Sequence, residues 1–217
     1  MRRGTFRAGT VNYAAVGATR APDLMQYPPE HSIPAEESWR IGSGEERFRT
    51  AGDALLSWTA QRAAGLQIEN VRPASGPGYA GVTFDANGSP IAPSNREAEQ
   101  RFDAEGMPYV GAGMTLTLQG RVNGMSADAQ LRVITVTEES RHVGFILGTV
   151  DESVVSGEES FDLTWDEESD EVWFTVRAFD AAVSPLYKLL PALTKRRRRE
   201  LFARYLRAIS PLYATPL

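Results

Sequence analysis

The sequence of 217 residues contains no cysteine and only two histidines. Without cysteine, disulfide bonds, thiolate nucleophiles and cysteine-ligated metals are all excluded. His31 and His142 are far apart in the chain, which argues against a histidine-rich metal site. We therefore expect this protein to use neither a metal nor a cofactor.

Long apolar runs are also missing, because no segment approaches the roughly 20 apolar residues that a membrane-spanning helix needs. The basic N-terminus lacks the apolar core of a secretory signal, so we expect a cytoplasmic protein. The formal net charge of -5 argues against a surface that binds nucleic acid. The length suits one domain with a sizeable core.

Two helices and an N-terminal arm are expected from the pattern of the chain. Residues 1–40 are rich in proline and small residues, which predicts an extended arm packed on the domain. Residues 43–65 have the apolar spacing of a helix, with Ser43 and Glu46 as a capping box and Gly65 as its end. A final amphipathic helix is expected from Ser184, with Pro185 in its first turn and a kink at Pro191, and extends to Ile209.

Between these helices, short segments alternate apolar and polar residues, as strands do when only one face is buried. Tight polar turns separate most of them, which predicts an antiparallel meander. The polar stretch 85–107 is expected to be a loop insertion. The strands are expected at residues 114–119, 131–139, 142–150, 161–165 and 172–179.

This order of elements predicts an α+β fold in which a curved antiparallel sheet wraps around a long C-terminal helix, the helix-grip arrangement. Residues 41–217 are expected to form that single domain, preceded by the arm. A bent sheet closed by a helix often leaves a ligand cavity between the two layers.

Several separated motifs resemble those of uncharacterised protein family 0548, a bacterial and plant domain of unknown function. They are "VNYAAVGAT" at 11–19, "IGSGEERFRTAGDALLSW" at 41–58, and "GFILGTV" followed by "SGEESF" at 144–161. The resemblance covers most of the chain apart from 85–107 and implies a START-like, Bet v 1-like helix-grip fold. The family typically has Pro-Gly-His before its S-G-E-E motif, whereas this chain has Ser153 where the histidine is expected.

Candidate site residues follow from the expected cavity. Glu158 and Glu159 are the candidate acid/base residues, and at most one can face the cavity because neighbouring strand residues point to opposite faces. The alternative for both residues is a position in a turn or an ion pair with a basic side chain of the expected C-terminal helix. The candidate ligand-binding residues, which could equally be core or strand-bending positions, are Gly144, Phe145, Gly148, Thr149, Trp165, Trp173 and Phe174.

The basic run at 195–199 suggests a second kind of contact. Lys195, Arg196, Arg198 and Arg199 could attract an anionic membrane surface or an acidic partner. Arg197 is expected to turn toward the packed face and pair with an acid. The alternative is a solvated helix face whose charge is balanced by the acidic residues 151–171.

Three functions remain open from the sequence. The leading hypothesis is the binding of a small apolar or amphipathic molecule between the sheet and the C-terminal helix. The second is an enzyme, such as a cyclase, dehydratase or hydrolase, that uses Glu158 or Glu159 in the same cavity. The third is an interaction protein that docks through its basic helix.

Overall fold

The structure, a computed structural model, is built around one antiparallel sheet with the strand order β1-β10-β9-β8-β7-β5-β2, and β6 pairs with β5. It describes residues 11–74, 83–84, 90–91, 100–122, 125–126, 128–150, 155–182 and 191–210. The strands are β1 Ile33–Ser43, β2 Leu66–Arg72, β5 Thr115–Val122, β6 Met125–Ser126, β7 Ala129–Glu139, β8 His142–Thr149, β9 Val155–Asp166 and β10 Glu171–Ala182, with a separate pair β3 Thr83–Phe84 and β4 Pro90–Ile91.

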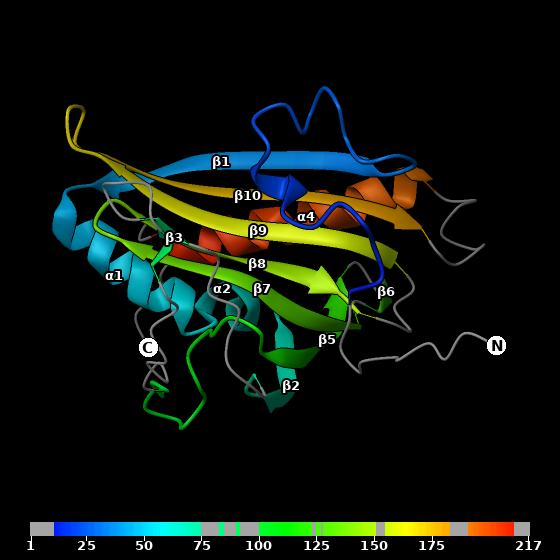
Figure 1. The fold of residues 1–217 in the computed structure, drawn as a ribbon, viewed down its shortest axis with the longest axis horizontal. Coiled ribbons are helices and arrows are strands. Elements are labelled where there is room, and N and C mark those ends of the chain that lie inside the picture. The colour runs from blue at the N-terminus through cyan, green and yellow to red at the C-terminus, as the bar shows by residue number, and fades with distance from the viewer. Residues whose placement is uncertain are drawn as a thin grey trace.

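Two layers cover the opposite faces of this sheet (Figure 1). The helices α1 (Glu45–Leu56), α2 (Thr59–Ala63) and α4 (Pro191–Ile209) pack on one face. The N-terminal segment, with the short 3-10 helix η1 (Ala18–Arg20), crosses the other face. The core lies between the sheet and the helices, so the predicted α+β helix-grip fold is confirmed. All five predicted strands overlap observed ones.

The first strand corrects the expected extent of the N-terminal arm. Residues 33–40 belong to β1, which pairs antiparallel with β10 along its length. Ile33, Ala35, Trp39 and Ile41 lie at alternate positions of β1, with the exposed Glu37 as the exception in this series, and a period of two fits a half-buried strand. Segment 11–32 therefore crosses the sheet, whereas the following residues are part of the sheet itself.

The helix expected at 43–65 is broken in two at Trp58. This residue has a left-handed backbone, with φ 65°, and its fully buried indole packs edge-to-face on Phe145. The expected capping box is wrong, because α1 begins after Gly44 without a side-chain cap. Gly65, with φ 83°, follows the C-cap residue Ala64 of α2, close to the expected helix end.

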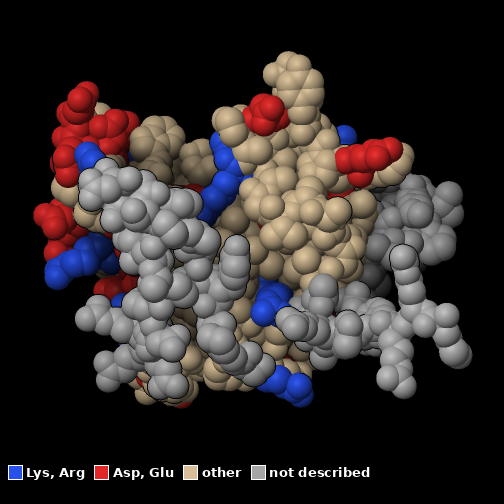
Figure 2. Space-filling model, viewed as in Figure 1, with Lys and Arg blue, Asp and Glu red and all other residues tan. Residues whose placement is uncertain are grey.

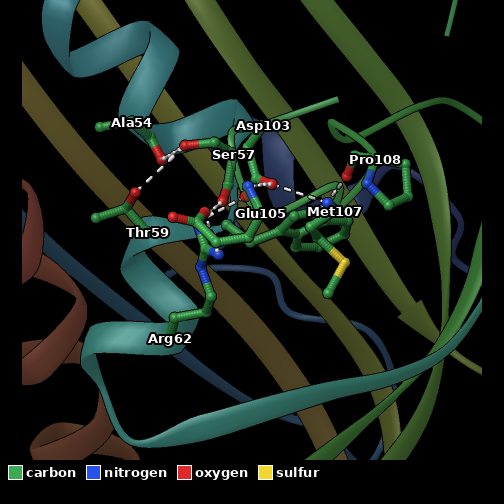
Figure 3. A network of polar contacts seen from close by, with 9 residues as sticks. Ala54, Ser57, Thr59, Arg62, Asp103, Glu105, Met107 and Pro108 are labelled. Carbon is green, nitrogen blue, oxygen red and sulfur yellow. Dashed lines mark hydrogen bonds and ion pairs between the residues drawn. The ribbon is translucent and has the colours of Figure 1, made fainter. Parts of the chain in front are cut away.

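Segment 100–111 docks on the corner between α1 and α2 (Figure 3). Asp103 accepts the backbone N–H of Met107 at 2.8 Å and pairs with Arg62 at 3.0 Å. Burial acts to raise the pKa of Asp103, but these hydrogen bonds and Arg62 outweigh it and hold the pKa below its ordinary value. The Trp58 indole N–H donates to the Pro108 carbonyl at 2.9 Å, which joins this segment to the core.

Two sequence predictions fall partly outside the described residues. Of the expected insertion at 85–107, the structure describes β4 and the turn at 100–107. The expected helix start at Ser184 and Pro185 lies outside the described residues. The same is true of all residues from 183 to 190, which precede the kink expected at Pro191. The described helix α4 begins at Pro191.

The close approach of β9 and β10 at Gly157 gives a test of the sheet. A Cβ at Gly157 would overlap the Phe179 carbonyl oxygen and lie 2.7 Å from the Asp180 Cα. We expect Gly157→Ala to lower the free energy of unfolding by about 1–3 kcal/mol, as overpacking does. Chemical denaturation followed by circular dichroism measures this change.

Gly52, in the middle of α1, is the matched control. A Cβ there would meet only Val143, at an ordinary 3.5 Å. Gly52→Ala should raise the free energy of unfolding by about 1 kcal/mol through helix propensity. Equal effects of the two substitutions would contradict the close packing of β9 on β10.

Candidate functional site

Strand β9 divides its side chains between the two faces of the sheet. Phe161 and Leu163 are fully buried in the core with α4. Glu158 and Asp162 instead contact the N-terminal segment on the other face. Because strand residues alternate, Glu159 shares the helix-facing side with Phe161, and the two adjacent glutamates have separate environments.

A cavity of about 780 Å³ lies between the sheet and α4. Most of its wall is aliphatic, from β2, β5, β7, β8 and α4. A smaller part is polar and comes from β8, β9, β10, α4 and His31. The apolar wall includes Leu66, Leu118, Ala129, Leu131, Leu147 and Leu201, and the polar wall includes Thr149, Glu159, Asp180, Thr194, Arg197, Arg198 and Tyr205.

The polar wall is organised around an ion pair between Arg198 and Asp180. The Arg198 side chain is only 11% exposed, and it also donates to the Ile33 carbonyl at 2.8 Å. This guanidinium therefore ties α4 to β10 and to the start of β1. Such a pair balances the cost of burying each charge separately.

Glu159 lies in the same polar wall and is half-buried, with the cavity beside it. Burial raises the pKa of Glu159 to about 8, and the negative charge of Asp180 adds to the rise. The charges of Arg198 and Arg197 and a hydrogen bond from Tyr205 act in the opposite direction. A carboxyl group in this setting can exchange a proton near neutral pH.

Tyr205 of α4 is the aromatic member of this polar wall. It is 1% exposed, and its ring packs edge-to-face on Phe161 with 5.1 Å between centroids. Burial and the nearby Glu159 raise the pKa of the Tyr205 phenol well above its ordinary value. The phenol therefore stays protonated and donates its hydrogen bond to Glu159.

Glu158, on the opposite face, is 3% exposed and holds the N-terminal segment in place. Its carboxylate accepts the backbone N–H of Gly17 at 2.7 Å and of Thr19 at 3.0 Å. The hydroxyls of Thr19 and Tyr13 donate to the same carboxylate. Glu158 is thus an anchor for segment 11–20. The residue also borders the cavity, but its carboxylate is held by the N-terminal segment.

The two glycines of β8 also belong to this outer face. A Cβ at Gly148 would collide with the Tyr13 hydroxyl, and one at Gly144 would lie 2.7 Å from the Asp162 carboxylate. The space that these glycines leave is therefore occupied by the chain itself. Asp162 also accepts from Arg20 at 3.1 Å and lies 2.8 Å from the His142 ring nitrogen.

The other expected ligand-binding residues are spread over the fold. Thr149 lines the cavity and exchanges hydrogen bonds with the backbone of Gly157. Phe145 and Phe174 are fully buried in the core. Trp165 stacks on Phe48 and Trp173 is 37% exposed. Of the residues named from the sequence as ligand-binding, only Thr149 is in the wall of the cavity.

The basic run of α4 is split between the cavity and the surface. Arg197 and Arg198 line the cavity, so Arg198 is not the freely exposed side chain expected. Lys195, Arg196 and Arg199 are exposed, and their contact with an anionic surface stays a prediction. None of the described helices is long and apolar enough to cross a membrane.

The acidic hairpin between β9 and β10 lies far from this basic run. The hairpin and the start of α1 form one end of the molecule, whereas the start of α4 is near the other end (Figure 1). Figure 2 shows acidic side chains gathered at the hairpin end. Of the basic run, Arg198 pairs with Asp180 of β10 rather than with the tip of the acidic hairpin.

A comparison of the sequence with models of known protein families finds one match. A family model described as a domain of unknown function (DUF1990) matches residues 12–208. The chain belongs to this family. The match agrees with the uncharacterised domain expected from the motifs over most of the chain. Among curated proteins, none shows significant sequence similarity.

Solved structures share the fold at low sequence identity. The di-domain ARO/CYC protein BexL from the BE-7585A biosynthetic pathway is 9% identical, with a TM-score of 0.50 over 90% of this chain and 54% of BexL. The chain thus spans about half of BexL. Major latex-like protein 151 from Panax ginseng is 10% identical, with a TM-score of 0.46, over 85% and 99% of the two chains. Norcoclaurine synthase from Thalictrum flavum is also 10% identical, with a TM-score of 0.47, over 86% and 96%.

The structure also brings together residues that the sequence did not single out. Asp180 and Tyr205 join Glu159 in the cavity, and Tyr13 and Thr19 join Glu158 outside it. Asp180 stands in an otherwise apolar stretch of β10, "AFDAA", which could have marked it as a partner for a buried cation. Ser153, in place of the family histidine, lies outside the described residues.

The anchoring role of Glu158 can be tested by removing its carboxylate. Glu158→Ala would leave four donors without their acceptor, so we expect the free energy of unfolding to fall by about 3 kcal/mol. Hydrogen exchange measured by mass spectrometry should show the largest gain in segment 11–24. Glu37→Ala, at an exposed position of β1, is the control. Equal exchange in both variants would exclude the anchor.

Proposed function

We propose that this protein binds a small amphipathic molecule in the cavity between the sheet and α4. The observation that carries the proposal is the cavity itself, whose volume of about 780 Å³ lies within the range of roughly 300–1,000 Å³ common for small-molecule sites. An aliphatic wall with a few convergent polar groups is also what such sites contain.

The distribution of the wall residues favours an amphipathic ligand over a purely apolar one. Leucine and alanine side chains from β5, β7 and β8 would contact an apolar body. Glu159, Asp180, Arg197 and Arg198 gather near the ends of β9 and β10 and would surround a polar group. A ligand with a polar group could form hydrogen bonds with these side chains in place of the water that it displaces, whereas a purely apolar ligand could not.

The cavity can be filled or enlarged at one position to test the proposal. Leu147 of β8 is 1% exposed and lines the cavity. Leu147→Trp should reduce ligand occupancy, because the larger side chain takes up the space. Leu147→Ala enlarges the same space and should retain binding, although it should lower the free energy of unfolding by about 2–5 kcal/mol.

Native mass spectrometry of each variant, with denaturing extraction of the bound molecule, measures occupancy. Thermal melts establish that each variant is folded. Equal occupancy in the two folded variants would place the ligand elsewhere and contradict the proposal.

A second candidate function is acid/base catalysis in the same cavity, which the environment of Glu159 favours. Its carboxyl group combines a pKa near neutrality with contact to the cavity and to the Tyr205 phenol. A group of this kind can donate or accept a proton at neutral pH. Glu158 is not a candidate for this role, because its carboxylate is occupied on the outer face.

The raised pKa of Glu159 has a consequence for stability. Because the folded protein retains a proton that the unfolded chain releases near pH 4.5, the free energy of unfolding falls as pH rises from about 4.5 to about 8. Each unit of pKa difference contributes about 1.4 kcal/mol. The fall levels off above the folded-state pKa.

Glu159→Gln removes this titration with little change of shape. The variant should gain stability relative to the wild type across that pH window, which denaturation at a series of pH values measures. Glu37→Gln serves as the exposed control and should follow the wild type. A constant difference between Glu159→Gln and the wild type would show that Glu159 titrates normally.

A further inference from the structure

A second hollow lies on the sheet where β2, β5 and β7 form one edge (Figure 1). This groove has a volume of about 530 Å³. It belongs to the outer face, because its wall residue Arg132 is the register partner of Gly148 and Gly148 faces Tyr13 on that side. Among the described residues, only Leu131 borders both this groove and the cavity under α4. The groove is therefore a separate candidate site.

The wall of this groove is rich in polar side chains from three neighbouring strands. They are Asn70, Arg72, Thr115, Thr117, Gln130 and Arg132. No Asp or Glu is among the described residues of the wall. Two guanidiniums, two hydroxyls and two amides can all donate hydrogen bonds, so the groove is suited to a ligand with several acceptor atoms.

The two arginines flank a threonine in one row of the sheet. Arg72 of β2 is the register partner of Thr115, and Thr115 is the register partner of Arg132 of β7. Register partners share a face and lie about 5 Å apart, so the Cα atoms of the two arginines are roughly 10 Å apart across Thr115. Long arginine side chains can approach a ligand above the Thr115 hydroxyl from both sides.

A bulge in β2 adds Asn70 to the same wall. The register of β2 against β5 shifts between Glu69 and Arg72, and Asn70 has a left-handed backbone, with φ 53°. Bulges re-aim side chains and are over-represented at sheet edges and next to active sites. Here the bulge lies at the edge strand and brings Asn70 and Arg72 into one groove.

Neither arginine has to give up a contact to bind a ligand. Arg72 is exposed and forms no ion pair within the described part of the chain. Arg132 is half-buried and has another interaction, but the five N–H donors of an arginine can serve two partners at once. An anion above Thr115 could therefore bind both guanidiniums.

We propose that this groove binds the phosphate group of a small polar molecule, a phosphate monoester such as a sugar phosphate. A phosphate offers three acceptor oxygens to donors on three strands, whereas a carboxylate offers two. Guanidiniums bind phosphate oxygens through charge-assisted, often paired hydrogen bonds. The Thr115 hydroxyl would donate to the phosphate between Arg72 and Arg132.

The rest of the groove favours a polar body on this phosphate. Its volume of about 530 Å³ lies within the range of roughly 300–1,000 Å³ of small-molecule sites, so the groove has room for more than the phosphate itself. Asn70, Thr117 and Gln130 could exchange hydrogen bonds with sugar hydroxyls. An apolar body would displace water from these side chains without replacing its hydrogen bonds.

Three probes with one hexose body test the charged group on the full-length protein. Glucose-6-phosphate, glucuronate and glucose carry a phosphate, a carboxylate and no charge, and isothermal titration calorimetry at low salt measures their affinities. We expect glucose-6-phosphate to bind at least about tenfold more tightly than glucose, with glucuronate between them. Equal affinity of glucuronate and glucose-6-phosphate would overturn the preference for phosphate. No measurable binding of glucose-6-phosphate would overturn the site.

Inorganic phosphate tests the polar body. It should bind more weakly than glucose-6-phosphate, because it lacks the hydroxyl groups that contact the remaining wall. Equal affinity of the two would show that the groove recognises phosphate alone and would overturn the polar body.

Matched variants locate the phosphate beside Arg72. Arg72→Gln should reduce the affinity for glucose-6-phosphate by at least about tenfold, the loss expected for charge-assisted hydrogen bonds, and leave glucose unchanged. Arg121→Gln removes the same charge from an exposed position of β5 outside the described wall and should change the affinity less than about twofold. Equal losses in the two folded variants would indicate attraction by overall charge and overturn the inference.

The cavity under α4 provides the test of location. Leu147→Trp narrows that cavity from the inner face and should leave the affinity for glucose-6-phosphate unchanged. In NMR spectra of the wild type, the backbone amides of Thr115 and Arg132 should shift most when glucose-6-phosphate is added. Loss of binding in folded Leu147→Trp, or shifts confined to cavity residues such as Thr149 and Tyr205, would place the phosphate in the cavity and overturn the outer site.

Discussion

The alternation of side chains along β9 is the constraint on which both faces of this protein depend. Glu158 and Glu159 are neighbours in the sequence, yet one binds the N-terminal segment and the other lines the cavity. Pairing of β9 with β8 and β10 fixes this assignment, because a shift by one residue would exchange the two faces. The core residues Phe161 and Leu163 oppose such a shift, since it would expose them.

The outer face shows how a buried carboxylate can serve structure alone. Glu158 receives four donors from Tyr13, Gly17 and Thr19, so its charge is well compensated. Gly148 leaves the room that Tyr13 occupies. The segment that crosses the sheet is therefore held by specific contacts at one site, and the outer face of β8 and β9 is covered there.

The inner face combines an apolar wall with a cluster of charged and polar groups. Asp180 and Arg198 connect β10 to α4, while Glu159 and Tyr205 form a hydrogen-bonded pair beside the space that remains. The likeness in fold to BexL concerns the arrangement of the layers, so the proposed ligand rests on the side chains of this chain.

Much of the fold could be predicted from periodicity, because strands with one buried face alternate apolar and polar residues. The five predicted strands follow from this alternation, and the C-terminal helix follows from apolar residues at helical spacing. Other features depend on contacts between distant parts of the chain: the break at Trp58 accompanies its packing on Phe145 and its hydrogen bond to Pro108.

The site was predictable in part for the same reason. Alternation separates Glu158 from Glu159, but it does not say which one faces the cavity, since this depends on the whole sheet. The link between Asp180 and Arg198 joins two segments that local patterns cannot bring together. Gly144 and Gly148 were expected to bind a ligand, but they lie outside the cavity wall, and Tyr13 and Asp162 occupy the space beside them.

Carbon-13 NMR of the glutamate side-chain carboxyl groups, titrated with pH and assigned with Glu159→Gln, tests the environment of Glu159 most directly. A Glu159 resonance that titrates near pH 8 is the expected result. It would show that this carboxyl group is desolvated in the wall of the cavity. A Glu159 resonance that titrates near its ordinary value of about 4.5 would contradict the buried environment described for Glu159.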